Sequence, residues 1–398
     1  MRAILLGLLL AAGMPALAAE LVMPSAAVRE FITVRDAETK GRELARLPVG
    51  QRAELLGSTP SAHLVRLADG TVGYVVRRFT RTLSTDGPLV PLEGELELHF
   101  LDVGEGDATL VVCPDRSSLL IDAGSTGPVD KTVSSYLDAA LGADKGRLNT
   151  VIVTHPDPQH FNLLQLLLRG HSLQRVLHAS ELADYDDARF LSWLRGQNGV
   201  QRLGMADVAA ELRPVTEVDC GGALVQVLSA GLATRTDWLD NLSVVVKISF
   251  GDFSALLPGD AGAEVEASLL QRYSPAFLDV DLLKLADGGV QGESNGPNFL
   301  AALQPQIAVI SNAGRNPAGA PHGTLLMQLQ SFAAAVEGPP HTLSFSYRGD
   351  DGPRWQENRA LRQHVYSTAD AGNIVVVSDG SGFSVRTARL AVPKPAAD

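Results

Sequence analysis

The chain has 398 residues, a formal net charge of −12 and a hydrophobic content of 45%. This length allows two or three domains, and the apolar fraction excludes extensive disorder outside the termini. Because an acidic balance repels polyanions, we expect no general affinity for nucleic acid.

The first 19 residues have the pattern of a secretory signal peptide. Arg2 precedes an apolar run over residues 3–13, and Ala16-Leu17-Ala18 supplies the small residues of a cleavage site. This order is typical of segments that are removed on export; a buried amino-terminal helix is the alternative. No later apolar stretch approaches the ~20 residues that a membrane-spanning helix needs. We therefore expect a periplasmic or secreted protein without a transmembrane anchor.

Short strand-like runs separated by turn residues occupy residues 24–84 and predict a small all-β domain. The runs are Ile32–Arg35, Ala53–Leu56, His63–Leu67 and Val72–Val76. Two of the motifs there, Ile32-Thr33-Val34-Arg35 and Asp69-Gly70-Thr71-Val72-Gly73-Tyr74, resemble the bacterial SH3-like family. That resemblance implies a barrel that binds a cell-envelope ligand or serves as a spacer. Residues 85–95, which are rich in Pro and Gly, are predicted to form a linker.

Strands alternate with helices over residues 96–390, a pattern that predicts a layered α/β domain, and a tail follows at 391–398. The predicted strands are Leu96–Val103, Thr109–Cys113, Ser118–Ile121, Thr150–Val153, Leu224–Leu228, Ser243–Phe250, Phe253–Leu257, Asp281–Leu285, Ile307–Ser311 and Ile374–Val377. The predicted helices are Val129–Leu141, one that begins near His160, Ala263–Arg272, Pro297–Leu303 and His322–Val336.

Motifs with glycine, aspartate or histidine follow the ends of several predicted strands. In chain order they are Asp102-Val103-Gly104-Glu105-Gly106-Asp107, Ile121-Asp122-Ala123-Gly124, Thr154-His155-Pro156-Asp157-Pro158-Gln159-His160, Asp240-Asn241-Leu242-Ser243, Pro258-Gly259-Asp260-Ala261 and Lys284-Leu285-Ala286-Asp287-Gly288-Gly289. The series resembles the metallo-β-lactamase superfamily and, within it, the ComEC-like branch, named for the extracellular domain of DNA-uptake channels. The resemblance implies an αββα sandwich whose loops present ligands to one or two divalent ions for hydrolysis.

The sequence departs from the branch pattern at three places. Gln159 replaces the second aspartate of His-x-Asp-x-Asp-His, Gly-His-His-Gly is Ala286–Gly289, and His-Pro-His is Ala320-Pro321-His322. A neutral amide is a poor zinc ligand and cannot act as a general base. The candidate metal ligands that remain are His155, Asp157, His160 and Asp260, with Asp287 as a substitute ligand. We expect a single divalent ion, Zn or Mn, rather than two.

Each candidate ligand also has a local explanation that involves no metal. His155 and His160 could bond to the turn that holds them, and Asp157 and Asp260 could cap helices. The aspartates near glycines are predicted to form turns; they are Asp102, Asp107 and Asp122.

Two functions therefore stay open at this level. One is a metal-dependent hydrolase of a phosphodiester or another ester, and the other is a non-catalytic protein that binds an unknown ligand or partner through a vestigial cleft. The cysteines leave two alternatives as well. An exported protein permits a disulfide between Cys113 and Cys220, while two separate buried thiols fit the sequence equally.

Overall fold

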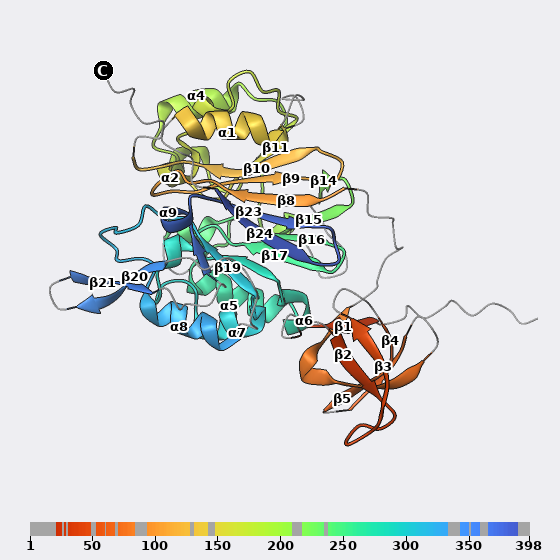
Figure 1. Ribbon diagram of the computed structural model, residues 1–398. Coiled ribbons are helices and arrows are strands. Elements are labelled where there is room, and N and C mark those ends of the chain that lie inside the picture. The colour runs from red at the N-terminus through yellow and green to blue at the C-terminus, as the bar shows by residue number, and fades with distance from the viewer. Residues whose placement is uncertain are drawn as a thin grey trace, which may run out of the picture. The chain divides into compact units, whose positions relative to one another are not determined.

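The computed structural model (Figure 1) describes most of the chain in two compact units, residues 1–90 and 91–398. The described residues are 21–25, 28, 31–48, 53–59, 61–67, 71–83, 94–127, 131–141, 148–208, 217–234, 238–332, 343–349, 352–358 and 365–388. The predicted signal peptide over 1–19, most of the predicted linker over 85–95 and the predicted tail over 391–398 lie outside these residues.

The N-terminal unit is a small all-β structure, as the turn-separated runs predict. Its described strands form one antiparallel sheet in the order β3-β2-β6-β5-β4-β1-β7. The bounds are β1 (Leu21–Pro24), β2 (Phe31–Arg35), β3 (Glu43–Pro48), β4 (Ala53–Ser58), β5 (Ala62–Arg66), β6 (Val72–Val76) and β7 (Thr80–Leu83), with the 3-10 turn η1 (Arg77–Phe79) before β7. Alternate side chains such as Ile32 and Val34 point into a small core, which the period of two requires.

The C-terminal unit is an αββα sandwich. Its first sheet has the order β13-β12-β11-β10-β9-β8-β23-β24 among the described strands. The bounds are β8 (Leu96–Phe100), β9 (Ala108–Val112), β10 (Ser118–Ala123), β11 (Leu148–Val153), β12 (Arg175–His178), β13 (Val200–Arg202), β23 (Asn373–Ser378) and β24 (Phe383–Ala388). Every residue of β9 and β10 is buried, because both faces of the sheet are covered.

The second sheet has the described order β14-β15-β16-β17-β18-β19-β22. The bounds are β14 (Glu217–Cys220), β15 (Ala223–Ser229), β16 (Val245–Phe250), β17 (Phe253–Leu257), β18 (Leu282–Lys284), β19 (Ile307–Ile310) and β22 (Val365–Ser367). A separate hairpin pairs β20 (Leu343–Gly349) with β21 (Gly352–Asn358). A disulfide between Cys113, just after β9, and Cys220, the last residue of β14, joins the two sheets. The pairing that the sequence left open is therefore present.

Helices cover the outer faces of both sheets. In Figure 1, α1 and α4 lie over the first sheet, whereas α5, α7 and α8 lie over the second. The bounds are α1 (Lys131–Leu141), α2 (Pro158–Phe161), α3 (Leu164–Leu167), α4 (Ala188–Arg195), α5 (Ala263–Arg272), α6 (Pro275–Leu278), α7 (Pro297–Leu303), α8 (Gly323–Phe332) and α9 (Thr368–Ala371), with 3-10 turns η3 (Leu182–Asp184), η4 (Met205–Asp207), η5 (Leu239–Leu242) and η6 (Asp287–Gly289).

Two hydrophobic cores hold these layers together. One lies between the sheets and includes Phe100, Phe250 and Phe253, and the other packs α1, α3 and α4 on the first sheet through residues such as Phe190. The predicted helix near His160 is two short helices, α2 and α3, separated at residues 162–163. Its first turn begins at Pro158, whose fixed φ and missing N–H suit the start of a helix.

Candidate metal centre

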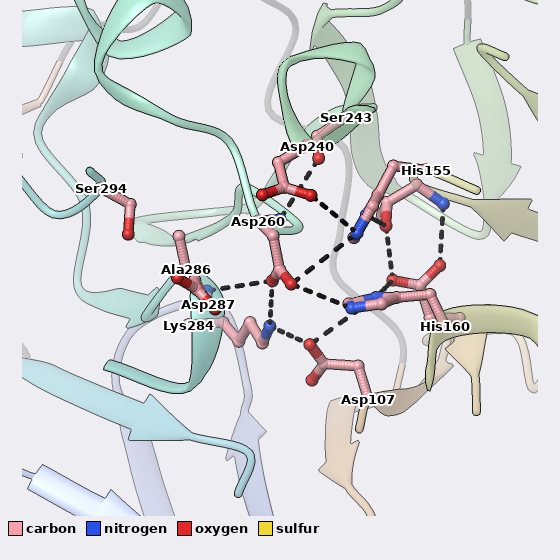
Figure 2. A network of polar contacts seen from close by, with 12 residues as sticks. Asp107, His155, His160, Asp240, Ser243, Asp260, Lys284, Ala286, Asp287 and Ser294 are labelled. Carbon is pink, nitrogen blue, oxygen red and sulfur yellow. Dashed lines mark hydrogen bonds and ion pairs between the residues drawn. The ribbon is translucent and has the colours of Figure 1, made fainter. Parts of the chain in front are cut away.

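Strand ends from both sheets meet at one edge of the sandwich and bring polar side chains together. In the first sheet, the parallel strands β10 and β11 end at the edge where their antiparallel neighbour β9 begins. In the second sheet, the parallel strands β17 and β18 end where the antiparallel strand β16 begins. Loops and strand termini at this edge place the following residues in one network: Asp107, Asp122, Thr154, His155, His160, Asp240, Asp260, Lys284 and Asp287 (Figure 2).

His160, on α2, is fully buried between two carboxylates. Its Nδ1 lies 2.9 Å from Asp122 Oδ2, and its Nε2 lies 3.0 Å from Asp260 Oδ2. Burial by itself lowers the pKa of His160, but Asp260 and Asp122 outweigh burial and raise the pKa well above its usual value. Each ring nitrogen thus lies within hydrogen-bond distance of a carboxylate, and the two carboxylates favour the protonated form of the ring.

Asp122, near the end of β10, holds His160 and the Thr154 backbone in place through hydrogen bonds. One of its oxygens accepts from the Thr154 amide at 2.8 Å, and the other accepts from the Thr154 hydroxyl at 2.7 Å as well as from His160. The sequence predicts a turn role for Asp122, whereas the structure places the residue within β10, where its φ is 59° and the register with β9 shifts. The carboxylate also orients an imidazole, as the outer partner of a metal-bound histidine does.

Glycines allow the turn that carries His160 to sit against β10. A Cβ on Gly124 would lie 2.2 Å from the Gln159 carbonyl carbon, and one on Gly106 would lie 2.3 Å from the Gly124 carbonyl oxygen. Both contacts are with backbone, which cannot move aside cheaply. Glycine at 124 is therefore required by the close approach of the chain that positions His160.

Asp260 divides its two oxygens between different partners. Oδ1 accepts from the Asp287 amide at 3.0 Å and lies 3.8 Å from Lys284 Nζ, whereas Oδ2 faces the histidines. Although burial raises the pKa of Asp260, the His160 and Lys284 cations hold it well below the usual range. The alternative that Asp260 caps a helix is wrong, because the N-cap of α5 is Gly262 and no side chain caps it.

His155 is the buried group with an unused ligand atom. Its Nε2 has no hydrogen-bond partner among the described residues and lies 3.8 Å from Asp260 Oδ2 and 3.7 Å from Asp240 Oδ1. Burial, followed by the neighbouring His160 charge, lowers the pKa of His155 to about 3, so the ring is neutral and able to coordinate.

One ligand atom from each of His155, His160 and Asp260 can be chosen so that all three lie within 4.8 Å of one another. An orphaned buried nitrogen beside a second imidazole and a carboxylate is a donor set that fits a divalent cation such as zinc. A cation bound there would replace the proton that His160 Nε2 shares with Asp260, because a ligating imidazole must be neutral at that nitrogen.

The other two predicted ligands lie outside this three-residue cluster. Asp157 is the N-cap of α2, and its Oδ1 accepts from the Gln159 amide at 3.0 Å. Asp287 contributes its backbone amide to Asp260. Burial, followed by the charge of Asp260, raises the pKa of the Asp287 carboxyl to about 7. His322 lies apart as well, since its Nδ1 accepts from the Gln291 amide and its Nε2 contacts the Ala318 carbonyl.

The sequence interpretation gave no functional role to four groups of the site, Asp107, Asp122, Asp240 and Lys284. Asp240, on η5, faces His155 and has a pKa that burial, followed by Asp260, raises to about 6. Lys284, the last residue of β18, contacts Asp107 Oδ2, and both side chains are buried. The sequence signal for Lys284 is a lysine among the leucines at 282, 283 and 285 of a predicted buried strand, where charged side chains are rare.

The chain belongs to the metallo-beta-lactamase superfamily, whose family model matches residues 101–346. Among curated proteins it is similar to ComE operon protein 3 of Bacillus subtilis, with 26% identity over 307 residues that cover 72% of this chain and 36% of that protein. It is also similar to Recombination protein 2 of Haemophilus influenzae, with 25% identity over 242 residues that cover 61% of this chain and 27% of that protein. The chain thus matches about a third of the length of these relatives.

Among solved structures, the chain is similar to the metallo-beta-lactamase fold protein YhfI from Bacillus subtilis. It is 14% identical with a TM-score of 0.40, and the match covers 71% of this chain and all of YhfI. The diiron β-hydroxylase CmlA from Streptomyces venezuelae is 17% identical with a TM-score of 0.38, and the match covers 58% of this chain and 46% of CmlA. Within the described part of the chain, no helix is both long and apolar enough to span a membrane.

Proposed function

We propose that this protein is an exported hydrolase that uses a single divalent ion held by His155, His160 and Asp260. The observation that carries the proposal is the grouping of three ligand atoms within 4.8 Å of one another, with His155 Nε2 buried and without a hydrogen-bond partner among the described residues. Leaving such a nitrogen unpaired costs free energy that a bound cation would recover.

The protein's own side chains would orient the site and handle protons. Asp122 holds the His160 ring so that Nε2 faces Asp260. Asp240 Oδ1 lies 3.7 Å from His155 Nε2 and would supply a carboxylate beside the ligands that takes a proton from water. When bound, the divalent ion supplies Lewis-acid polarisation of the substrate and activation of water.

Two imidazoles and a carboxylate suit Zn or Mn better than the harder Mg. A second ion would need protein ligands that the sequence has replaced, at Gln159 and at Ala286–Gly289. For this reason we propose one ion rather than two.

We propose an ester, in particular a phosphodiester, as the bond that is cleaved, by analogy with the ComEC-like relatives. The net charge of −12 argues against general affinity for nucleic acid, so substrate selection would fall to local contacts. The disulfide between Cys113 and Cys220 supports a periplasmic or secreted location, since such bonds persist in oxidising compartments. The N-terminal β unit is proposed to be SH3-like and to bind a cell-envelope ligand or act as a spacer.

A second candidate is a non-catalytic protein that binds a ligand through the same cleft, and the replaced ligands at 159 and 286–289 favour it. Elemental analysis of the purified chain, with and without loading by Zn or Mn, tests the metal site. We expect one equivalent in the wild type and its loss in His155→Ala and Asp260→Asn. Asp157→Asn is the matched control, because Asp157 lies outside the cluster and should keep the metal.

Absence of metal from the wild type under every loading condition would end the proposal. Stoichiometric metal without turnover of activated phosphodiesters or carboxylic esters would instead select the binding function.

A further inference from the structure

A cavity of about 560 Å³ lies beside α3 and α4, the helices that cover the first sheet (Figure 1). Its volume falls in the range of sites that hold small organic ligands. Three segments form its walls: the loop after β10, the chain from Asn162 to Arg169, and residues 187–193 at the start of α4. The side chains of these segments decide which ligand the cavity fits.

One wall of the cavity belongs to segments that also carry the metal centre. Asn162 Oδ1 accepts from the Ser125 amide at 3.0 Å, and Asn162 Nδ2 donates to the Ser125 carbonyl at 2.7 Å. Asn162 comes two positions after His160, and the Cα atoms of residues two positions apart lie within about 7 Å of each other. The cavity therefore adjoins the metal centre, although none of the three proposed metal ligands lines it.

Two arginines from different elements make the cavity locally cationic. Arg169 follows α3, and Arg189 lies in the first turn of α4. Within the described part of the chain, neither guanidinium has a hydrogen-bond or ion-pair partner. The one carboxylate in the lining, Asp187, caps α4, and its Oδ1 accepts from the Arg189 and Phe190 amides at 2.7 and 2.9 Å. Because the helix end stabilises that negative charge, both guanidiniums remain for an anion.

The same cavity also has an apolar wall. Trp193 packs against the buried Phe190, with ring centroids 5.7 Å apart and an angle of 29° between the rings, and this contact holds the indole in place. Leu166 lines the cavity as well and is 49% exposed. A ligand that joins an organic group to its anion would cover these side chains and gain from their burial, whereas an inorganic anion would not.

We propose that this cavity binds a phosphate ester, with Arg169 and Arg189 on the phosphate and Trp193 against the organic group. Guanidiniums suit phosphate because they form bidentate, charge-assisted hydrogen bonds with its oxygens. A phosphomonoester has three terminal oxygens, which serve two guanidiniums better than the two oxygens of a carboxylate do. The site is separate from the metal centre, so this inference goes beyond the proposed hydrolase and depends on no bound ion.

Isothermal titration calorimetry of the metal-free full chain with phenyl phosphate, inorganic phosphate and benzoate tests the site. We expect phenyl phosphate to bind more tightly than either of the other two. Arg169→Ala and Arg189→Ala should each weaken phenyl phosphate binding at least about tenfold, and Trp193→Ala should remove its advantage over inorganic phosphate. Arg195→Ala is the matched control, because Arg195 ends α4 outside the cavity lining and should keep wild-type affinity.

No binding of phenyl phosphate by the wild type would overturn this inference, and so would wild-type affinity in both arginine variants. Equal affinity for benzoate and phenyl phosphate would overturn the assignment to phosphate. If Trp193→Ala fails to fold by circular dichroism, the arginine variants decide, because both arginines are exposed and contribute nothing to the core. A chain that binds phenyl phosphate but no metal would lose the proposed function and keep this site, and the reverse result would do the opposite.

Discussion

Asp122 fixes the orientation of His160 through a hydrogen bond of 2.9 Å between the carboxylate Oδ2 and the imidazole Nδ1. Because Asp122 belongs to β10 and His160 to α2, the bond ties the loop that follows β11 to the neighbouring strand. The consequence is that Nε2 of His160 points at Asp260 and is available to a cation.

The first prediction concerns this orienting bond. Asp122→Asn should lower metal affinity by about 10–100-fold, the usual effect of losing the outer partner of a metal-binding histidine. Isothermal titration with Zn measures the change. Ser125→Ala is the control, because it removes a buried hydroxyl bond of 2.6 Å to the Val103 carbonyl in the loop after β10 and leaves the partners of the three ligands in place. That control should reduce stability by about 1 kcal/mol and leave the affinity close to wild type. Equal loss of affinity in both variants would contradict the orienting role.

Gly124→Ala should lower both stability and metal affinity. Its Cβ would lie 2.2 Å from the Gln159 carbonyl carbon, so the α2 turn must shift, at a cost of about 1–3 kcal/mol. Gly127→Ala is the matched control, since a Cβ there meets nothing within 4 Å. Urea denaturation compares the two variants with the wild type. A Gly124→Ala protein as stable as Gly127→Ala would show that the close approach is unimportant.

The sequence predicted the layered α/β domain and the small β unit because their signals are local. Buried runs such as Phe253–Leu257 have the length and apolar content of covered strands, and β17 has those bounds. The hairpin β20–β21 was not predicted, since Gly338–Asn358 combines Gly, Pro and charged residues without a clear period. The two strands of this hairpin pair mainly with each other, and the residue composition of a segment does not predict which strand it pairs with.

The site was predicted in part for the same physical reason. His155, His160 and Asp260 were expected from the resemblance to the metallo-β-lactamase superfamily, and the structure brings their ligand atoms together. Asp157 was also expected to bind metal, but its Oδ1 is used by the Gln159 amide in a helix cap. The Lys284–Asp107 ion pair could not be predicted from the sequence, because 177 positions separate the two residues. Only the fold shows that both side chains are buried and in contact.

Removal of the disulfide should destabilise the C-terminal unit. Cys113 and Cys220 are 107 positions apart, and loss of a bond that closes a long loop costs about 2–5 kcal/mol. The double variant Cys113→Ser/Cys220→Ser should therefore unfold at lower urea concentration than the wild type. A reducing agent should shift the wild-type transition in the same direction and leave that of the double variant unchanged. If reductant shifts both alike, the bond is not the source of the difference.

Glu266 makes stability depend on pH through a site outside the ligand cluster. This α5 residue is 5% exposed, and its Oε2 accepts from the Gly296 amide at the start of α7. Burial raises its pKa from 4.5 to about 7, and the bonds from Gly296 and Asn295 oppose the rise only partly. Between these two pKa values the folded state holds more protons than the unfolded state. The contribution of Glu266 to stability is therefore fully present below pH 4.5 and is lost as pH rises towards 7.

Glu266→Gln keeps an oxygen that can accept from Gly296 but has no charge to desolvate. At pH 8 it should be more stable than the wild type by an amount on the order of 2 kcal/mol, and near pH 4.5 the two should be similar. Urea denaturation at several pH values measures the difference between the two proteins, which cancels the titration of the groups they share. A difference that stays constant from pH 4.5 to pH 8 would mean that the carboxyl of Glu266 titrates normally in the folded protein.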